Sequence, residues 1–274
     1  MTAWERILEL VNIESDLPNQ LLTGFLIVMR ILPIVFLTPF LGGKLVPSET
    51  RLGLSLGLAL MVFPYASMGV TSGLEVNGPT FILLLFKELF LGFVIGYVAA
   101  ELFYAMEIGG RAVDVMRGAN QAEVQVPELS LRVSPIGQFN FQLLLVIFCA
   151  LDGHTYFIES IMKSFELVPL DAFPTFRGSF YHFTESILKY FSGLFAIAFS
   201  LVFPALFASF ITDVVFGMFN RIAPQLNAYF MAMGVKAMGG LFMFMVALRL
   251  MMSRLVDQLE QSLIFVRRLI ELWG

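Results

Sequence analysis

Residues 80–106 read TFILLLFKELFLGFVIGYVAAELFYAM, and this stretch decides the fold class. Only Lys87, Glu88 and Glu101 carry charge in it. A helix that crosses a bilayer needs about 20 consecutive, predominantly apolar residues. The stretch is long enough for this, and its three charges need partners if it is buried. It therefore predicts a helix that lies in a membrane or inside other protein.

The composition of the whole chain agrees with a membrane protein. Hydrophobic residues make up 58% of the sequence and charged residues 14%, against about 45–50% and about 25% in soluble proteins. The net charge of −4 gives no indication of a nucleic-acid surface. The single cysteine, Cys149, cannot form an internal disulfide. Residues 1–20 lack a basic segment followed by a cleavage site, so we expect no signal peptide.

Six hydrophobic blocks can be marked along the chain. They occupy residues 21–41, 52–70, 80–106, 136–151, 187–212 and 228–252. Residues 253–274 follow as an amphipathic tail with apolar residues at helical spacing. Between the blocks, we expect a surface excursion with short helices at 152–183 and a broken segment at 213–227. The predicted fold is an all-α membrane protein of about six hydrophobic helices in packed hairpins, several kinked or broken, plus an amphipathic C-terminal helix, in one domain over 1–274.

Several of the blocks contain charged residues. A charge at the bilayer centre costs a few kcal/mol or more, and an isolated buried charge is strongly unfavourable. We therefore expect many of these helices to be buried in protein or to line a wet cavity, with their charges in interhelical or intersubunit ion pairs. The residues concerned are Arg30, Lys87, Glu88, Asp213 and Lys236.

Residues typical of an active site are nearly absent. The only histidines, His154 and His182, have no cysteine or carboxylate pair at metal-ligand spacing beside them. We find no phosphate loop and no G-x-S-x-G motif, and we predict neither an enzyme nor a cofactor or metal. Gly92 and Gly96, four residues apart, predict a close contact between helices.

Residues 109–135 are predicted to form a long polar loop. Asp114 and Arg117 are three residues apart, so they can pair on a helical turn, and glycines on both sides free the backbone. One interpretation is a solvated loop with an incidental ion pair. The other is a plug in a conduit, closed by a partly hydrated pair worth on the order of 1 kcal/mol. The plug candidates are Gly110, Val113, Asp114, Val115, Met116, Arg117, Gly118, Asn120 and Gln121.

Four sequence boxes follow one another along the chain. They are RILPIVFLTPFLGGKLVPSETRLGLSLGLALMVFP from Arg30, KELFLGFVIGY from Lys87, GGRAVDVMRG from Gly109 and RIAPQLNAYFMAMGVK from Arg221. In this order they resemble the FliR/SctT family of type III secretion export-apparatus proteins. The motif residues are Pro33, Pro47, Pro224, Gln225 and Asn227.

Details within these boxes bear on the branch of the family. The box Asp114-x-x-Arg117-Gly118 is similar to the injectisome T component, whereas the flagellar branch usually lacks this pair. Gly234 stands where the family often has proline, and the stretch after Asn120 departs from the usual acidic-proline pattern.

The resemblance implies a location and partners. Members occur as one copy in a helical assembly with several copies of the R and S components, alongside the U and V components, in the bacterial inner membrane. Unfolded polypeptides pass through the assembly, which in relatives is drawn out of the bilayer plane. We also expect the chain to contact membrane lipid. The alternatives are a flagellar paralogue and a six-span small-solute transporter, for which we find no internal inverted repeat.

Overall fold

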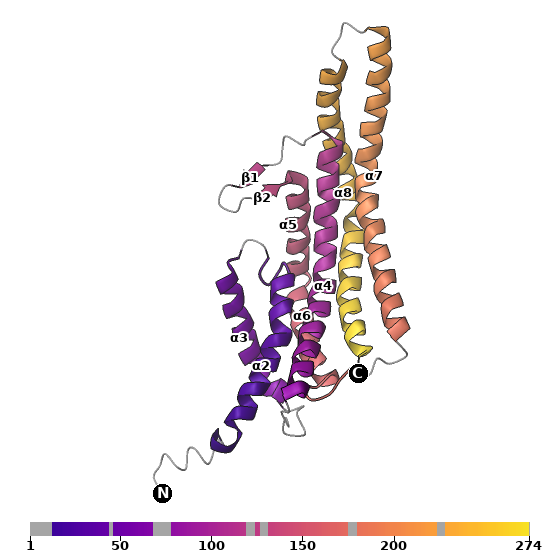
Figure 1. Cartoon of the computed structure of the whole chain (residues 1–274). Helices are drawn as coiled ribbons and strands as arrows, with labels where there is room; N and C mark the ends of the chain where they lie inside the picture. The colour runs from indigo at the N-terminus through magenta and orange to yellow at the C-terminus, as the bar shows by residue number, and fades with distance from the viewer. Residues whose placement is uncertain are drawn as a thin grey trace. The chain divides into compact units, whose positions relative to one another are not determined.

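A computed structural model of the chain describes residues 13–43, 46–67, 78–118, 124–126, 131–174, 180–223 and 228–273. The elements are α2 (Ile13–Leu37), α3 (Ser48–Ser67), α4 (Gly78–Met116), β1 (Val124–Val126), β2 (Leu131–Val133), α5 (Pro135–Ala150), α6 (Gly153–Leu167), α7 (Phe180–Ile222) and α8 (Ala228–Glu271) (Figure 1). Over these ranges, four helices are long and apolar enough to cross a membrane, or five if α5 and α6 form one broken span. The chain is thus an all-α, multi-pass membrane protein, as predicted, apart from the short antiparallel pair of β1 and β2, which was not predicted.

Three helices run further than the hydrophobic blocks. α4 continues to Met116, so residues 109–116 are helical and the prediction of a loop there is wrong. α7 continues through 213–222 without the expected break. α8 joins the sixth block and the amphipathic tail into one helix. A charged residue ends a hydrophobic block but does not end a helix, because the backbone hydrogen bonds continue through it.

The chain divides into two compact units. The first consists of residues 1–100, 155–180 and 265–274, and the second of residues 101–154 and 181–264. Helices α4, α6 and α8 contribute to both units, and each unit is described separately below.

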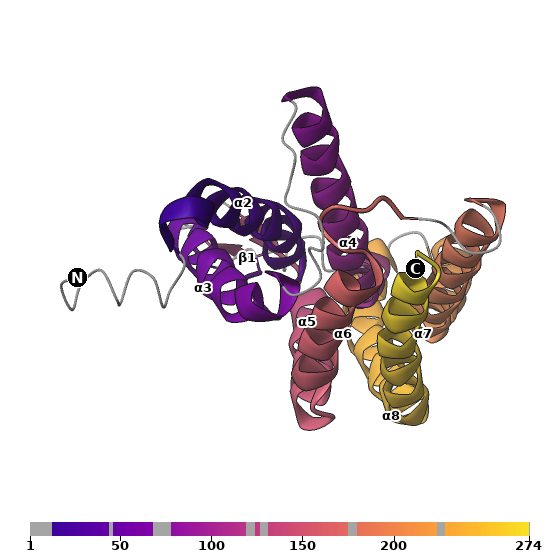
Figure 2. The same ribbon diagram turned by 90° about the horizontal axis from the view of Figure 1, so that it is seen from below.

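In the first unit, α2 and α3 form an antiparallel hairpin (Figure 2). The Arg51 guanidinium lies 4.7 Å from the centre of the Phe36 ring near the turn, and Gly24 faces Phe63 further along. α4 packs on α2 through two glycines, as the spacing of Gly92 and Gly96 predicts. A Cβ at Gly92 would overlap the carbonyl of Arg30, and one at Gly96 would lie 2.9 Å from the Cα of Ile34. The small residues allow the two backbones to touch.

In the second unit, α7 and α8 form a long antiparallel hairpin (Figure 1). A buried hydrogen bond of 2.6 Å between Tyr190 and Ser262 joins the helices near one end, and an ion pair between Asp213 and Lys236 joins them towards the other. The end of α4 packs against α5, where a Cβ at Gly110 would lie 2.6 Å from the Cα of Gly137.

Candidate functional site

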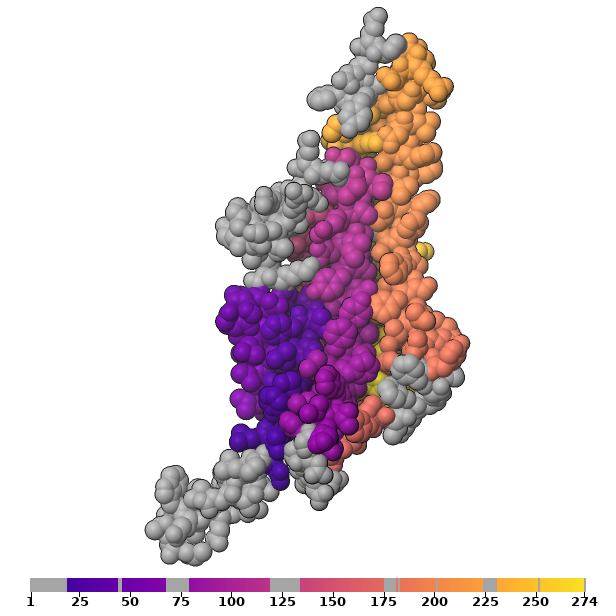
Figure 3. Space-filling model, viewed as in Figure 1, coloured from indigo at the N-terminus to yellow at the C-terminus, as the bar shows by residue number. Residues whose placement is uncertain are grey.

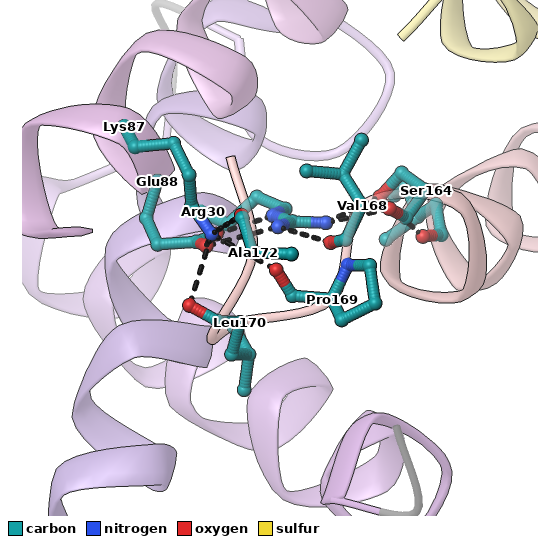
Figure 4. A network of polar contacts seen from close by, with 9 residues as sticks. Arg30, Lys87, Glu88, Ser164, Val168, Pro169, Leu170 and Ala172 are labelled. Atoms are coloured by element: carbon teal, nitrogen blue, oxygen red, sulfur yellow. Dashed lines mark hydrogen bonds and ion pairs between the residues drawn. The ribbon is translucent and has the colours of Figure 1, made fainter. Parts of the chain in front are cut away.

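A buried cluster of charges in the first unit is centred on Arg30, whose side chain is fully buried (Figure 4). The guanidinium Nε pairs with Glu88, and Nη2 donates to Oε1 of the same carboxylate at 3.0 Å. Nη1 also donates to the backbone carbonyl of Ser164 at 2.8 Å and to its hydroxyl at 3.3 Å, and Nη2 donates to the carbonyl of Val168 at 2.9 Å. The pairing is bidentate, which is the strongest geometry between arginine and a carboxylate.

Lys87 lies in the same cluster and is almost as buried. Its ammonium pairs with Oε1 of Glu88 at 2.7 Å. It also donates to the carbonyl oxygens of Pro169, Leu170 and Ala172 at 3.0, 3.0 and 2.9 Å. These carbonyls follow the end of α6 at Leu167. The carbonyl end of a helix carries partial negative charge, which favours cations.

In this cluster Arg30 and Lys87 share the carboxylate of Glu88, and backbone carbonyl oxygens accept hydrogen bonds from both cations. Both carboxylate oxygens of Glu88 are occupied by cations, so this site offers no free base. Its evident effect is mechanical, because it fastens the turn at 164–172 to α2 and α4. Sequence analysis identified all three charged side chains. It missed the carbonyl acceptors. Every residue carries a backbone carbonyl, and no side-chain pattern marks the ones that will face a buried cation.

A second buried cluster lies in the second unit, around Asp114. Its Oδ1 accepts from Nε of Arg117 at 2.8 Å and pairs with Nη2 at 2.6 Å. Its Oδ2 accepts from the hydroxyl of Ser134 and from the backbone N–H of Ile136 at 2.9 Å. Ser134 is the N-cap of α5, and its Oγ accepts from the N–H of Gly137 at 3.1 Å. A carboxylate at a helix N-terminus is stabilised by the helix dipole.

This arrangement, named here the Asp114 clasp, corrects the expectation of a partly hydrated pair. Asp114 is only 2% exposed, and it binds both ends of the segment between α4 and α5. Removing one partner of such a buried pair costs about 3–5 kcal/mol, far more than the 1 kcal/mol expected for a wet pair.

The predicted plug residues divide into three groups. Gly110, Val113, Asp114, Val115 and Met116 belong to α4 rather than to a loop. Val113 is buried, while Val115 and Met116 are 47% and 39% exposed. Arg117 and Gly118 follow the helix, and Gly118 has a φ of 76°, a conformation that favours glycine. Asn120 and Gln121 lie outside the described residues, before the antiparallel hairpin of β1 and β2.

The other predicted residues lie away from these clusters. Asp213 and Lys236 pair at 2.5 Å between α7 and α8, with the Asp213 side chain 58% exposed, so their burial in an assembly stays a prediction. Pro33 lies inside α2, and the carbonyl of Pro47 accepts from the N–H of Arg51 at 3.1 Å as α3 begins. The motif residues Pro224, Gln225 and Asn227 fall outside the described part of the chain.

Comparison with known proteins gives one family and several relatives. The family model described as "Bacterial export proteins, family 1" matches residues 21–262. The Yop proteins translocation protein T of Yersinia pestis is 32% identical over 217 residues, which cover 79% of this chain and 80% of that protein. The flagellar biosynthetic protein FliR of Bacillus subtilis is 28% identical over 257 residues, 93% of this chain and 97% of its own length. The surface presentation of antigens protein SpaR of Shigella sonnei is 26% identical over 221 residues, 79% and 81% of the two chains.

Proposed function

Because this chain belongs to family 1 of the bacterial export proteins, which serves type III secretion and flagellar export, we propose that it is the T component of a type III secretion export gate. In this proposal it is a non-enzymatic subunit in the bacterial inner membrane, and both of its units act as one membrane domain. It forms part of the conduit through which unfolded proteins are secreted. Its partners are the R and S components, present beside a single copy of this chain, and the U and V components.

The observation that carries this proposal is the length of one apolar stripe on α7. Large side chains that are all 45–79% exposed follow one another along the helix, and from Phe195 on they recur at steps of three or four residues, so that the stripe turns gradually around the helix. The stripe consists of Leu188, Phe195, Phe199, Phe203, Phe207, Phe210, Ile211, Val214, Met218 and Ile222. Figure 3 shows part of α7, in orange, on the visible face.

The stripe is too long to be covered by lipid alone. From Leu188 to Ile222 it measures about 50 Å at about 1.5 Å per residue, whereas the hydrocarbon layer is about 30 Å thick. Even at a tilt of about 40°, the upper end of the usual range, the stripe would still span about 38 Å. Large exposed apolar surface outside the bilayer is covered by protein in stable assemblies. Partner subunits packed along α7 would supply this cover.

The assembly is tested by purification with and without partners. We expect the chain expressed alone in detergent to aggregate or be degraded, and co-expression with the R and S components to give a stable complex. The reason is that the exposed stripe of α7 then finds apolar partners. A stable lone monomer with saturable uptake of a small solute would instead favour the transporter alternative.

The plug is the second part of this proposal. We propose that the segment between Gly118 and Ser134 closes the idle conduit, with the Asp114 clasp holding its base in place. Opening would then occur within the segment, since loops open locally at low free-energy cost, and would leave the clasp intact.

The plug is tested by replacing residues 119–132 with a short glycine–serine linker. This change keeps Asp114, Arg117 and Ser134. We expect the gate to assemble and the cells to become more permeable to small molecules. The same linker in place of residues 71–77, another connection in the chain, serves as the control and should leave permeability unchanged. An assembled gate that stays as tight as the wild type would show that the segment is not the plug.

The flagellar alternative remains in view because FliR of Bacillus subtilis matches 93% of this chain. Complementation distinguishes the two. The T component should restore secretion in a strain that lacks its own T protein, and should fail to restore motility in a strain that lacks FliR. The reverse result would assign the chain to the flagellar branch.

A further inference from the structure

The second unit contains an apolar groove between the start of α5 and one side of α8. It has a volume of about 680 Å³. Phe139 of α5 and Phe244 of α8 both line it, and their rings meet edge to face with their centres 6.4 Å apart. Of the residues that line the groove, only Arg117 and Arg249 are charged.

The two arginines stand at different levels of α8. Arg117 packs on Gly240, where an added Cβ would lie 2.8 Å from the Cβ of Arg117. Arg249 follows Gly240 by nine residues, which is about 14 Å at about 1.5 Å per residue. The groove therefore has a cation towards each end and apolar side chains between them.

Within the described part of the chain, only Arg117 is paired with an anion, the carboxylate of Asp114. Arg249 is exposed, and over the same residues it has neither an ion-pair nor a hydrogen-bond partner. It is also the only charged residue of α8 between Lys236 and Arg254. A lone charge in such an apolar stretch indicates a site with a partner of opposite charge.

The surface around Arg249 is apolar and exposed. Met245 lines the groove and is 62% exposed, and Leu250, next to Arg249, is 72% exposed. A protein that covers these side chains also removes water from the guanidinium. A cation that is buried without an anion is strongly unfavourable. The covering protein must therefore supply a carboxylate at this position.

A helix suits this groove better than a lipid chain does. Side chains on a helix form ridges that fit into the grooves of neighbouring helices. A lipid with its phosphate on Arg249 would direct its acyl chain towards Arg117 and Asp114, where it would meet a second charged group. A helix can cross the groove with apolar side chains and place an acidic residue at one end.

We propose that the groove binds one helix of a partner subunit of the export gate, which inserts a ridge of large apolar side chains and pairs one carboxylate with Arg249. This inference rests on the proposed function, because it takes the covering protein to be an R or S component. A second copy of this chain is not the expected occupant, since the proposed assembly contains a single copy.

Photocrosslinking in the assembled complex tests which molecule fills the groove. A photoreactive phenylalanine analogue replaces Phe139 on α5 or Met245 on α8, which are 46% and 62% exposed, in the full chain co-expressed with the R and S components. Mass spectrometry locates the adducts. We expect both positions to label the same partner helix. Because Arg249 lies about one turn beyond Met245, we expect an aspartate or glutamate within about two turns of the residue labelled from Met245.

Charge substitutions test the ion pair. Arg249→Glu should lower the amount of partner subunits recovered with the tagged chain about tenfold, because two buried carboxylates would then face each other. Arg254→Glu makes the same change of charge at an exposed position on the other side of α8 and should leave the recovery unchanged. Exchange of the identified partner carboxylate for lysine should restore the recovery of Arg249→Glu, which separates a lost ion pair from misfolding.

The wild-type complex distinguishes failure of this inference from failure of the proposed function. If neither the R nor the S component is recovered with the wild-type chain, the proposed function is overturned and the inference with it. If they are recovered, the inference alone is overturned by adducts on lipid or on a second copy of this chain, or by labelling of a helix without a nearby acidic residue. Equal recovery of Arg249→Glu and Arg254→Glu, or no rescue by the lysine exchange, would also overturn it.

Discussion

Oδ2 of Asp114 accepts a hydrogen bond from the backbone N–H of Ile136, 22 residues further along the chain, with 2.9 Å between nitrogen and oxygen. This hydrogen bond joins the end of α4 to the first turn of α5. The two ends of the segment between these helices are therefore held together.

Removing the carboxylate should loosen this connection. We expect Asp114→Ala to lower the free energy of unfolding by about 3–5 kcal/mol, because the partly buried Arg117 loses its anion and α5 loses two hydrogen bonds at its start. Glu107→Ala, which removes the more exposed pair of Glu107 with Arg111, should cost about 0–1 kcal/mol. Thermal unfolding of the purified complex in detergent measures both. Equal losses of unfolding free energy in the two variants would show that the clasp contributes no more to stability than an exposed ion pair.

Exchanging the charges should not repair the clasp. In the double variant Asp114→Arg with Arg117→Asp, a guanidinium would face the N–H of Ile136, and two donors cannot bond each other. We expect the double variant to be no more stable than Asp114→Ala. A return to wild-type stability would show that the hydrogen bonds to α5 matter little.

Removing one charge from the cluster at Arg30 should reduce the yield of folded protein more than replacing all three charged residues by apolar ones. Glu88→Gln should strongly reduce the yield of folded protein, because it removes the carboxylate with which two buried cations pair. Glu185→Gln, which removes an exposed pair with Lys189, should have little effect. The triple variant with Met at Arg30, Lys87 and Glu88 should recover part of the yield, since an apolar core needs no compensating charge.

Size-exclusion profiles of fluorescent fusions report these yields. A lower yield of the triple variant than of Glu88→Gln would indicate that the hydrogen bonds from the cations to the carbonyls at 164–172 stabilise the fold more than the ion pairs with Glu88 do.

The glycine contacts predict that adding one methyl group, by a change from glycine to alanine, affects stability differently at different positions. Gly92→Ala should prevent the close packing of α4 on α2, because the new Cβ would overlap the carbonyl of Arg30. Gly193→Ala should be neutral or stabilising by up to about 1 kcal/mol, since the space beside Gly193 is open and alanine favours the helix. Comparison of the two unfolding midpoints tests this, and equal midpoints would contradict it.

The end of α8 predicts a response to acid. A hydrogen bond from Lys163, at 2.6 Å, holds the pKa of Glu271 below its ordinary value of about 4.5. Because this pKa is lower in the folded state, the contact stabilises the fold above pH 4.5 and is lost as the pH falls through the folded pKa. The contribution is small, because Glu271 is about half exposed.

Trp273, two residues away and almost fully buried, can report this change. In a Trp4→Phe background, its fluorescence should shift to the red as the pH is lowered below 4.5. Glu271→Gln should abolish the dependence on pH in this range. An unchanged shift in Glu271→Gln would assign the transition to another group.

The amino-acid sequence by itself determined the fold class, the family and the contacts between neighbours in the chain. Apolar runs of membrane-spanning length need no tertiary information. The pairing of Asp114 with Arg117 follows from a spacing of three on a helix, and the close approach at Gly92 and Gly96 follows from small residues four apart.

The tertiary structure alone decided where the helices end and which distant groups satisfy the charges. α4 continued to Met116 through the polar residues that had suggested a loop. Arg30 found the carbonyl of Ser164, 134 residues away, and Asp114 found the N–H of Ile136. Backbone donors and acceptors occur at nearly every residue, so only the folded chain selects which of them meet a buried charge.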